Sequence, residues 1–169
     1  MGSSDSTYIR RKITPEKAFQ KLKHYCGYSE RSRTDVKQKL YSLGLNKKEV
    51  DELISRLVNE EYLDEERFAL QFASGKCHIS CWGKLKIRFE LRQKGIGEVL
   101  ITRALQSLDD REYESIFRKQ ADKKWRSLQS EKNIFVKKNK WQQFLQLKGF
   151  EPALIRIWSF PEEDKEGSN

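Results

Sequence analysis

Hydrophobic residues follow one pattern three times along this chain. A leucine is followed four residues later by a glycine and then at once by a large apolar residue, in the segments Leu40–Leu45, Leu91–Ile96 and Leu145–Phe150. A further large apolar residue stands four positions before each leucine, at Val36, Ile87 and Trp141. The glycines at 44, 95 and 149 are 51 and 54 residues apart. A period of this length is typical of an array of supersecondary units.

Each copy predicts three helices. In the first copy, Thr14 and Pro15 suit the start of a helix that carries apolar residues as far as Cys26. The next helix carries Val36 and Leu40, and Gly44 supplies the left-handed conformation that ends it. Asn46 is a suitable N-cap for the third helix, whose apolar positions recur at helical spacing: Val50, Leu53, Ile54 and Leu57.

The second and third copies repeat this order. Their leading helices carry Phe68 to Ala73 and Tyr113 to Trp125, and Pro152 stands near the start of the last helix. The only run with strand character is Ile134–Val136, which is too short to carry a sheet. We therefore predict an all-α fold of three helix-turn-helix-like repeats. The expected division is: residues 1–12 flexible, 13–60 repeat 1, 61–109 repeat 2, 110–161 repeat 3, divergent, and 162–169 a disordered tail.

Composition agrees with a helical protein that has small cores and large solvated faces. Of 169 residues, 37% are hydrophobic and 35% charged, and the sequence has no apolar run long enough to cross a bilayer and no signal-peptide pattern. Three cysteines argue against a disulfide framework and for the reducing cytoplasm. We expect a monomer with no membrane association.

Positive charge is concentrated in blocks that recur with the repeats. Residues 8–40 hold ten Lys and Arg against three acids, residues 76–103 seven against two, and residues 118–140 nine against two. Residues 46–67 are acidic, with eight acids and four bases. Equivalent positions of stacked repeats line up, so the cations are expected to form a stripe that attracts polyanions.

Aromatic residues lie within or beside the basic blocks, at Tyr28, Tyr41, Trp82 and Trp125. They either stack on unpaired bases or belong to the core, and burial is the favoured interpretation for Trp82 and Trp125. Arg31 and Arg33 are expected in a loop before a helix, free to reach a partner. Ser29 or Ser32 would cap that helix, with Asp35 in its first turn.

The sequence shows no catalytic constellation. It has no Gly-rich phosphate loop and no nucleophile elbow, and its two histidines, His24 and His78, lack an evident acid or nucleophile partner. Cys77, His78 and Cys81, with Cys26 and His24, do not have the spacing of a known zinc module, so we expect no metal and no cofactor. A magnesium nuclease would need carboxylates from separate elements, and Asp109 and Asp110 suit a solvated turn better.

Three ordered motifs carry a resemblance to the RecX family of regulatory proteins. They are the segments 25–40, from Tyr25 through Ser29-Glu-Arg-Ser-Arg33 to Leu40, 57–69, around Glu61-Tyr-Leu-Asp64, and 82–96, from Trp82-Gly-Lys84 to Gly95-Ile96. The resemblance covers about residues 17–108 and fades over 111–160. It departs from the family at Glu61, where the family usually has glycine, and a non-glycine residue resists positive φ.

The resemblance implies an elongated, curved array of three-helix repeats. It implies a protein that binds RecA, lies in the groove of the RecA–DNA filament and restrains recombinase, ATPase and coprotease activities in DNA repair and the SOS response. It also implies affinity for single- and double-stranded DNA. The leading hypothesis is thus a non-catalytic regulator. The rivals are a stand-alone DNA-binding helical repeat protein and a pure protein–protein scaffold.

The candidate residues fall into two groups. The cations expected to meet RecA or DNA phosphates are Arg31, Arg33, Lys37, Lys84, Lys86, Arg88, Arg92, Lys94, Lys123, Lys124 and Arg126. The residues expected to build the repeats are Gly44, Gly95, Gly149, Tyr62, Leu63 and Asp64. Tyr62 and Leu63 are expected to fill the join between repeats 1 and 2, with Asp64 capping the helix that follows.

Overall fold

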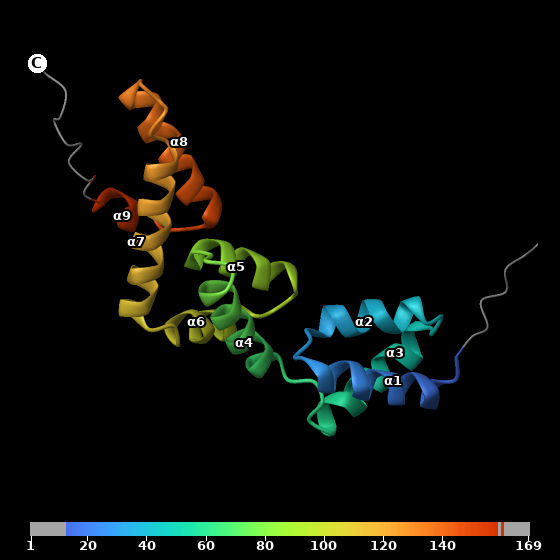
Figure 1. Cartoon of the computed structure of the whole chain (residues 1–169). Helices are drawn as coiled ribbons and strands as arrows, with labels where there is room; N and C mark the ends of the chain where they lie inside the picture. Colours follow the sequence, from blue (N-terminus) through green and yellow to red (C-terminus); the bar gives the residue numbers. More distant parts are fainter. Residues whose placement is uncertain (1–12, 159, 161–169) are drawn as a thin grey trace, which may run out of the picture. The chain divides into compact units, whose positions relative to one another are not determined.

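The computed structural model describes residues 13–158 and residue 160, so the predictions for 1–12 and 162–169 lie outside the described residues. Helices are the only regular elements of the described part, in agreement with the predicted all-α class (Figure 1). In chain order they are α1 (Pro15–Tyr28), α2 (Arg33–Ser42), α3 (Lys47–Asn59), α4 (Glu65–His78), α5 (Lys84–Gln93), α6 (Glu98–Gln106), α7 (Asp110–Ser127), α8 (Ile134–Lys148) and α9 (Pro152–Arg156).

Contacts divide the chain into two compact units. The first unit comprises residues up to Phe72 together with Glu90–Ser107, and the second comprises Ala73–Phe89 together with the residues from Leu108 onward. Helices α4 and α5 are therefore each divided between the two units. The sequence-based repeat boundaries at residues 60 and 109 stay a prediction.

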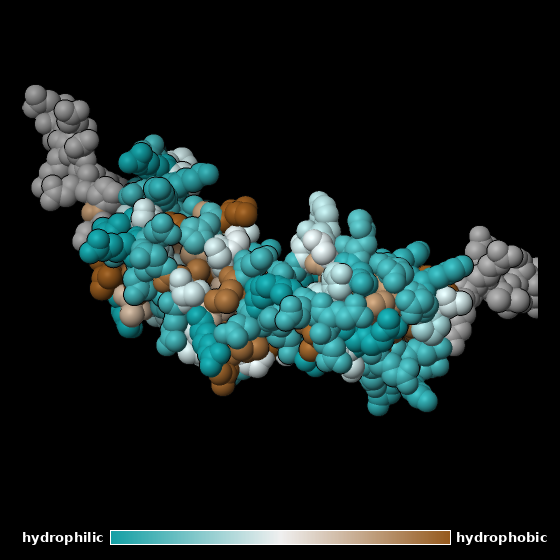
Figure 2. Space-filling model, turned by 90° about the horizontal axis from the view of Figure 1, so that it is seen from below, coloured by the Kyte–Doolittle hydropathy of each residue, from teal (hydrophilic) through white to brown (hydrophobic). Residues whose placement is uncertain are grey.

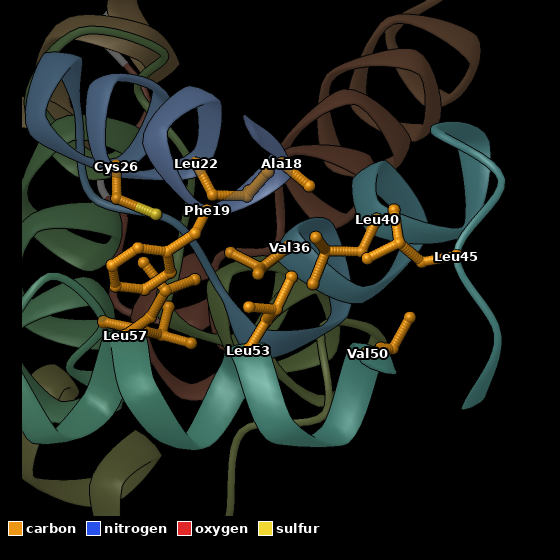
Figure 3. Close-up of a cluster of buried hydrophobic side chains, with 11 residues drawn as sticks. Ala18, Phe19, Leu22, Cys26, Val36, Leu40, Leu45, Val50, Leu53 and Leu57 are labelled. Carbon is orange, nitrogen blue, oxygen red and sulfur yellow. The ribbon is translucent and has the colours of Figure 1, made fainter. Parts of the chain in front are cut away.

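The first repeat is a bundle in which α3 packs on both α1 and α2. Its core is built from the apolar residues that the helical spacing singled out (Figure 3). Phe19 and Leu22 of α1, Val36 of α2 and Leu57 of α3 are all fully buried or nearly so. Burying a large apolar side chain contributes about 1.5–3 kcal/mol, so this core is the main source of stability in the repeat.

Side-chain caps fix where the helices of this repeat begin. Ser32 and Asp35 form a capping box on α2, in which the Ser32 hydroxyl accepts from the Asp35 N–H and the Asp35 carboxylate accepts from the Ser32 N–H. Asn46 and Glu49 form the same arrangement on α3. The predicted caps at Ser32 and Asn46 are confirmed, and each is worth about 1 kcal/mol.

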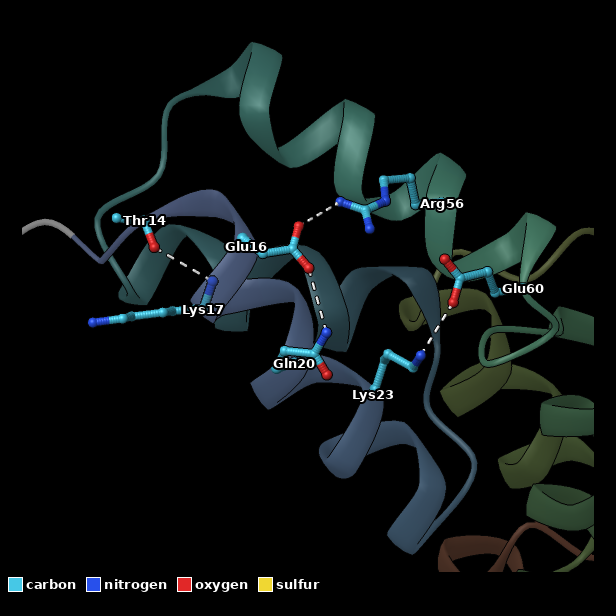
Figure 4. A network of polar contacts seen from close by, with 7 residues as sticks. All are labelled: Thr14, Glu16, Lys17, Gln20, Lys23, Arg56 and Glu60. Atoms are coloured by element: carbon cyan, nitrogen blue, oxygen red, sulfur yellow. Dashed lines mark hydrogen bonds and ion pairs between the residues drawn. The ribbon is translucent and has the colours of Figure 1, made fainter.

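Polar contacts also tie α1 to α3 on the surface (Figure 4). Arg56 donates to Glu16 at 3.1 Å, and Lys23 pairs with Glu60 at 3.2 Å. These side chains are solvent-exposed to a large degree, so the pairs contribute little to stability. They set the pairing of the two helices more than they stabilise it.

A glycine follows the middle helix of each repeat, as predicted: Gly149 comes directly after α8, and Gly44 and Gly95 come one residue later after α2 and α5. Gly44, Gly95 and Gly149 have φ values of +86°, +78° and +86°. In each case the next residue donates its N–H back to the leucine five positions earlier, as Leu45 does to the Leu40 carbonyl. This left-handed closure satisfies carbonyls at the helix end, and glycine adopts it without the strain that a Cβ atom brings.

The segment between α3 and α4 contains a non-glycine residue in the left-handed region. Glu61 has φ +60°, so the turn is kept although glycine is absent. Leu63 is buried in the core of the first repeat and Tyr62 packs against it. Asp64 accepts from the Arg67 N–H at 2.9 Å, as expected of a cap on α4.

The third repeat has an aromatic core. Phe150 lies 5.3 Å from Phe117 and 5.9 Å from Tyr113, measured between ring centroids. Trp141 of α8 is buried and donates its indole N–H to the Ala121 carbonyl of α7 at 3.0 Å. The run Ile134–Val136, which looked like a strand, is the first turn of α8, because Asn133 accepts from the N–H groups of Phe135 and Val136.

The face of the molecule shown in Figure 2 is mostly hydrophilic, with small separate apolar areas. None of the described helices is both long and apolar enough to cross a membrane. The described surface is therefore dominated by charged and polar side chains, which directs the search for a site toward charge.

Candidate polyanion-binding surfaces

The start of α2 is held by the glycine turn of the next repeat. Thr34 donates its hydroxyl to the Lys94 carbonyl at 2.8 Å, and the Lys94 ammonium pairs with Asp35 at 2.9 Å. Burial acts to raise the pKa of Asp35, but the hydrogen bonds from Lys94 and Ser32 outweigh it, and the pKa lies below its usual value. Lys94 is thus a structural residue of this junction.

The start of α5 is held by the glycine turn of the third repeat in a closely related way. Gly83 donates its N–H to the Lys148 carbonyl at 2.8 Å, and Leu85 donates to the Gly149 carbonyl at 3.0 Å. The unpaired N–H groups that begin α5 therefore meet the unpaired carbonyls that end α8. The glycines at 83 and 149 allow this approach, because a Cβ on Gly149 would lie 2.3 Å from the Lys86 Cβ.

Tyr113 completes the same junction. Its hydroxyl accepts from the Lys84 N–H at 2.9 Å and donates to Glu151 at 2.5 Å. Burial is the main cause that raises the pKa of Tyr113 far above its ordinary value, so the phenol stays protonated. The junction thereby fixes the backbone on which the cations of α5 are carried.

Lysines from α4, α5 and α8 gather around the turn before α5. The ammonium groups of Lys76 and Lys86 lie 4.7 and 4.5 Å from the centre of the Trp82 ring. Lys148 donates to the Ser80 carbonyl of the same turn at 3.1 Å. We call Trp82 with Lys76, Lys86 and Lys148 the Trp82 cluster. Trp82 itself is half-buried.

The Trp82 cluster has the chemistry of a polyanion contact. Three ammonium groups around one turn supply charge for phosphates or carboxylates, and the half-buried indole between them adds an aromatic surface. Cys81 in this turn has φ +52°, a conformation that non-glycine residues rarely adopt. Such strain is kept where the surrounding structure determines the geometry, here through the Gly83–Gly149 junction.

Several predicted contact cations are engaged within the chain. Arg31 stacks on Tyr25 at 4.1 Å, Lys84 pairs with Asp110 at 3.0 Å and Arg92 pairs with Glu98 at 2.9 Å. Arg33 was expected in a loop, but it is the first residue of α2 and pairs with Glu65 at 3.3 Å. Arg88 is also engaged.

Other predicted cations are more accessible. The side chains of Lys37, Lys123 and Arg126 are exposed and make no hydrogen bond, ion pair or ring contact with another described residue. Lys124 lies 5.1 Å from the centre of the Phe144 ring. Within the second unit, α7 therefore adds exposed charge through Lys123 and Arg126, and α2 does so in the first unit through Lys37.

The aromatic residues of the basic blocks divide between core and surface. Trp125 is buried under Lys137, whose ammonium lies 4.2 Å from the ring centre, so it belongs to the core as the favoured interpretation held. Trp82 is only half-buried. Tyr28 is 84% exposed and Tyr41 is 42% exposed. Of Trp82 and Trp125, only Trp82 is partly exposed and can contact a partner.

The cysteines do not form a metal centre in the described part of the chain. No group of three or more His, Cys, Asp and Glu side chains there could hold an ion. Burial raises the pKa of the Cys26 thiol to about 11 and also raises the pKa of Cys77. His78 donates to the Ser74 carbonyl, and this bond together with Glu112 raises its pKa.

Sequence reasoning did not place Lys76 and Lys148 in the site. Lys148 stands directly before Gly149 as Lys94 stands before Gly95, and this shared position was the available signal. It indicates a lysine at each junction with the preceding repeat.

Comparisons with known proteins identify domains with the same three-helix organisation. The family model described as RecX, second three-helix domain, matches residues 64–105, and that of the third three-helix domain matches residues 112–158. A crystal structure of regulatory protein RecX is similar with a TM-score of 0.76 and 26% identity, over 85% of this chain and 70% of that one. The structure of RecX from Lactobacillus salivarius gives 0.72 and 25%, over 84% and 92%.

Curated relatives named regulatory protein RecX are similar over most of this chain. The protein of Bacillus cytotoxicus is 29% identical over 84% of this chain and 52% of its own length. That of Pelodictyon phaeoclathratiforme is 31% identical over 82% and 86%, and that of Chlorobium phaeobacteroides 30% over 83% and 90%. The chain spans about half the length of the Bacillus relative. The relatives are named as regulatory proteins, which agrees with the prediction of a non-enzyme. The chain belongs to the RecX family.

Proposed function

We propose that this protein binds RecA assembled on DNA and restrains the recombinase, ATPase and coprotease activities of the filament. Membership of the RecX family supports the proposal. The observation that carries it to particular residues is the Trp82 cluster, where lysines from α4, α5 and α8 gather around a half-buried tryptophan. A nucleoprotein filament offers phosphates and acidic protein faces together, and both are matched by such a group.

The mechanism rests on simultaneous weak contacts. Lys37 in the first unit and the Trp82 cluster, Lys123 and Arg126 in the second can each meet a negative group of the filament. Contacts on one covalent chain raise each other's effective concentration, so binding is tight although each contact is weak. A chain that occupies the filament surface blocks the access that strand exchange and repressor cleavage require.

A RecA ATPase assay on single-stranded DNA tests the proposed function. We expect stoichiometric addition of this protein to lower the steady-state rate of ATP hydrolysis, and the inhibition to weaken as salt rises. An unchanged rate at saturating protein would contradict the proposal. The proposed protein acts as a monomer in the bacterial cytoplasm, where RecA acts and where its three thiols stay reduced.

A stand-alone DNA-binding protein is the second candidate, because exposed cations at Lys37, Lys123 and Arg126 need no RecA to meet phosphates. That function predicts equal affinity for bare DNA and for the RecA filament. The regulator predicts that RecA on the DNA raises the affinity. A binding titration on the same oligonucleotide with and without RecA separates the two.

A further inference from the structure

The third repeat contains a pocket with aromatic walls that the Trp82 cluster does not use. It has a volume of about 310 Å³ and lies between α8, α9 and Phe160. Trp141, Trp158 and Phe160 line it, with Trp141 5.8 Å from Trp158 and 5.0 Å from Phe160 between ring centroids. Flat π surfaces of this kind accept another planar ring by stacking or edge contact.

The rim of this pocket is cationic and polar. Lys138 and Gln142, one turn apart on α8, line it together with Arg156 at the end of α9. Among the described residues that line the pocket, none is acidic. The pocket therefore favours an occupant that carries negative charge beside its planar group.

One donor in the pocket wall has no acceptor. The indole Nε1 of Trp158 is shielded from solvent and makes no hydrogen bond with any residue that the structure describes. Leaving a buried donor unsatisfied costs about 1–3 kcal/mol, and most buried polar groups in proteins are satisfied. Trp141, in contrast, donates its own N–H to the Ala121 carbonyl. Because the Trp158 N–H is shielded from solvent, Trp158 offers an occupant of the pocket its partly exposed ring and not its N–H.

We propose that this pocket binds one unstacked base of a single-stranded nucleic acid together with its phosphate. The base supplies a planar ring for the partly exposed rings of Trp158 and Phe160, and Gln142 can pair with the base edge. Lys138 and Arg156 meet the phosphate. The volume lies at the small end of ligand sites, which suits a single nucleotide. This inference deepens the proposed function, since it names the ligand of a second contact on the same chain.

Photo-crosslinking of the full chain tests the pocket directly. The probe is an oligothymidylate of about 15 nucleotides with one 5-iododeoxyuridine, a length within the site sizes of single-strand binders. After irradiation, mass spectrometry maps the adduct. We expect it on Trp141, Trp158 or Phe160. Adducts confined to other residues, such as Trp82, would overturn the proposal.

Two neighbouring glutamines provide a matched pair of variants. Gln142 and Gln143 are both exposed on α8, but only Gln142 lines the pocket. We expect Gln142→Glu to weaken binding of the oligothymidylate about tenfold, because a carboxylate cannot donate to a carbonyl oxygen of the base edge as the amide can, and Gln143→Glu to change it less than about twofold. Equal effects of the two variants would overturn the proposal.

Changes at the tryptophan and in the probe identify what is held. Trp158→Phe keeps an aromatic ring, and we expect a smaller loss of oligothymidylate binding than with Trp158→Leu. Should Trp158→Leu fail to fold, the Gln142 and Gln143 pair still decides. An abasic oligomer of equal length should bind Gln142→Glu and the unchanged chain with less than about a threefold difference, since stacking on a base accounts for about 1–3 kcal/mol. The full tenfold loss with that oligomer would rule out base binding.

Competition with thymidine monophosphate separates the two sources of this chemistry. If thymidine monophosphate displaces the oligothymidylate at equal nucleotide concentration, the ligand is the free nucleotide. If it does not, the ligand is the strand. The crosslinking and oligothymidylate-binding assays contain no RecA, so a negative result in them leaves the proposed function intact. Loss of filament binding by Gln142→Glu without loss of oligomer binding would assign the pocket to a protein partner and overturn the proposal.

Discussion

Gly83 and Gly149 lie so close that neither position has room for a side chain. A Cβ atom on Gly83 would lie 2.1 Å from the carbonyl oxygen of Gly149, which is backbone and cannot rotate away. Through this contact the start of α5 meets the end of α8, and the Trp82 cluster is built on the turn directly before it.

Substitution of Gly83 by alanine should therefore destabilise the protein. We expect Gly83→Ala to lower the free energy of unfolding by at least about 2 kcal/mol, because the backbone must shift to relieve the overlap. Gly75→Ala is the matched control: Gly75 lies inside α4 with open space around it, and alanine there should raise stability by about 0.5–1 kcal/mol. Urea unfolding measures both, and similar effects of the two variants would refute the close approach.

The turn at Glu61 predicts a stabilising substitution. Glu61 holds φ +60°, which costs a residue with a side chain about 1–2 kcal/mol, so Glu61→Gly should raise the free energy of unfolding by about 0.5–1 kcal/mol after the entropy of glycine is subtracted. Glu60→Gly serves as control. Its φ is −91° and it pairs with Lys23, so glycine there should be destabilising. Loss of stability in Glu61→Gly would contradict the observed conformation.

The Asp35–Lys94 pair predicts a dependence of stability on pH. Because the folded-state pKa of Asp35 lies below its usual value of 3.8, its stabilisation is complete above that value and is lost as pH falls through the lowered folded-state pKa. Asp35→Asn should lower the free energy of unfolding by about 1–2 kcal/mol at neutral pH, with a smaller deficit near pH 2.5. Chemical unfolding at both pH values measures the deficit, and an equal deficit at both would show that the carboxylate charge is irrelevant.

The cysteines should differ in reactivity. Burial raises the pKa of Cys26 to about 11 and raises that of Cys77, whereas Cys81 is partly exposed in the turn that carries Trp82. A thiol reagent at about pH 8 should modify Cys81 quickly and Cys26 and Cys77 only on unfolding. Cys81→Ser should abolish the fast phase. Fast labelling of Cys26 or Cys77 in the native protein would disagree with their burial.

Local features of the fold could be predicted from the sequence, whereas long-range contacts could not. The closure at Gly44 and the caps at Asn46 and Asp64 depend on residues within a few positions of each other. The bond from Lys148 to the Ser80 carbonyl joins positions 68 residues apart, and no periodic pattern specifies it. The engagement of Lys84 and Arg92 with acids was missed for a related reason, since charge counts do not show which cations are paired.

Binding of RecA filaments by single charge variants tests the central claim most directly. Lys86 belongs to the Trp82 cluster, whereas Lys47 is an exposed lysine in the acidic block at the start of α3. Binding to RecA on fluorescent single-stranded DNA should weaken about tenfold for Lys86→Glu and stay within about twofold for Lys47→Glu, with unchanged helicity in both. Equal affinity of Lys86→Glu and the unchanged chain would contradict the account.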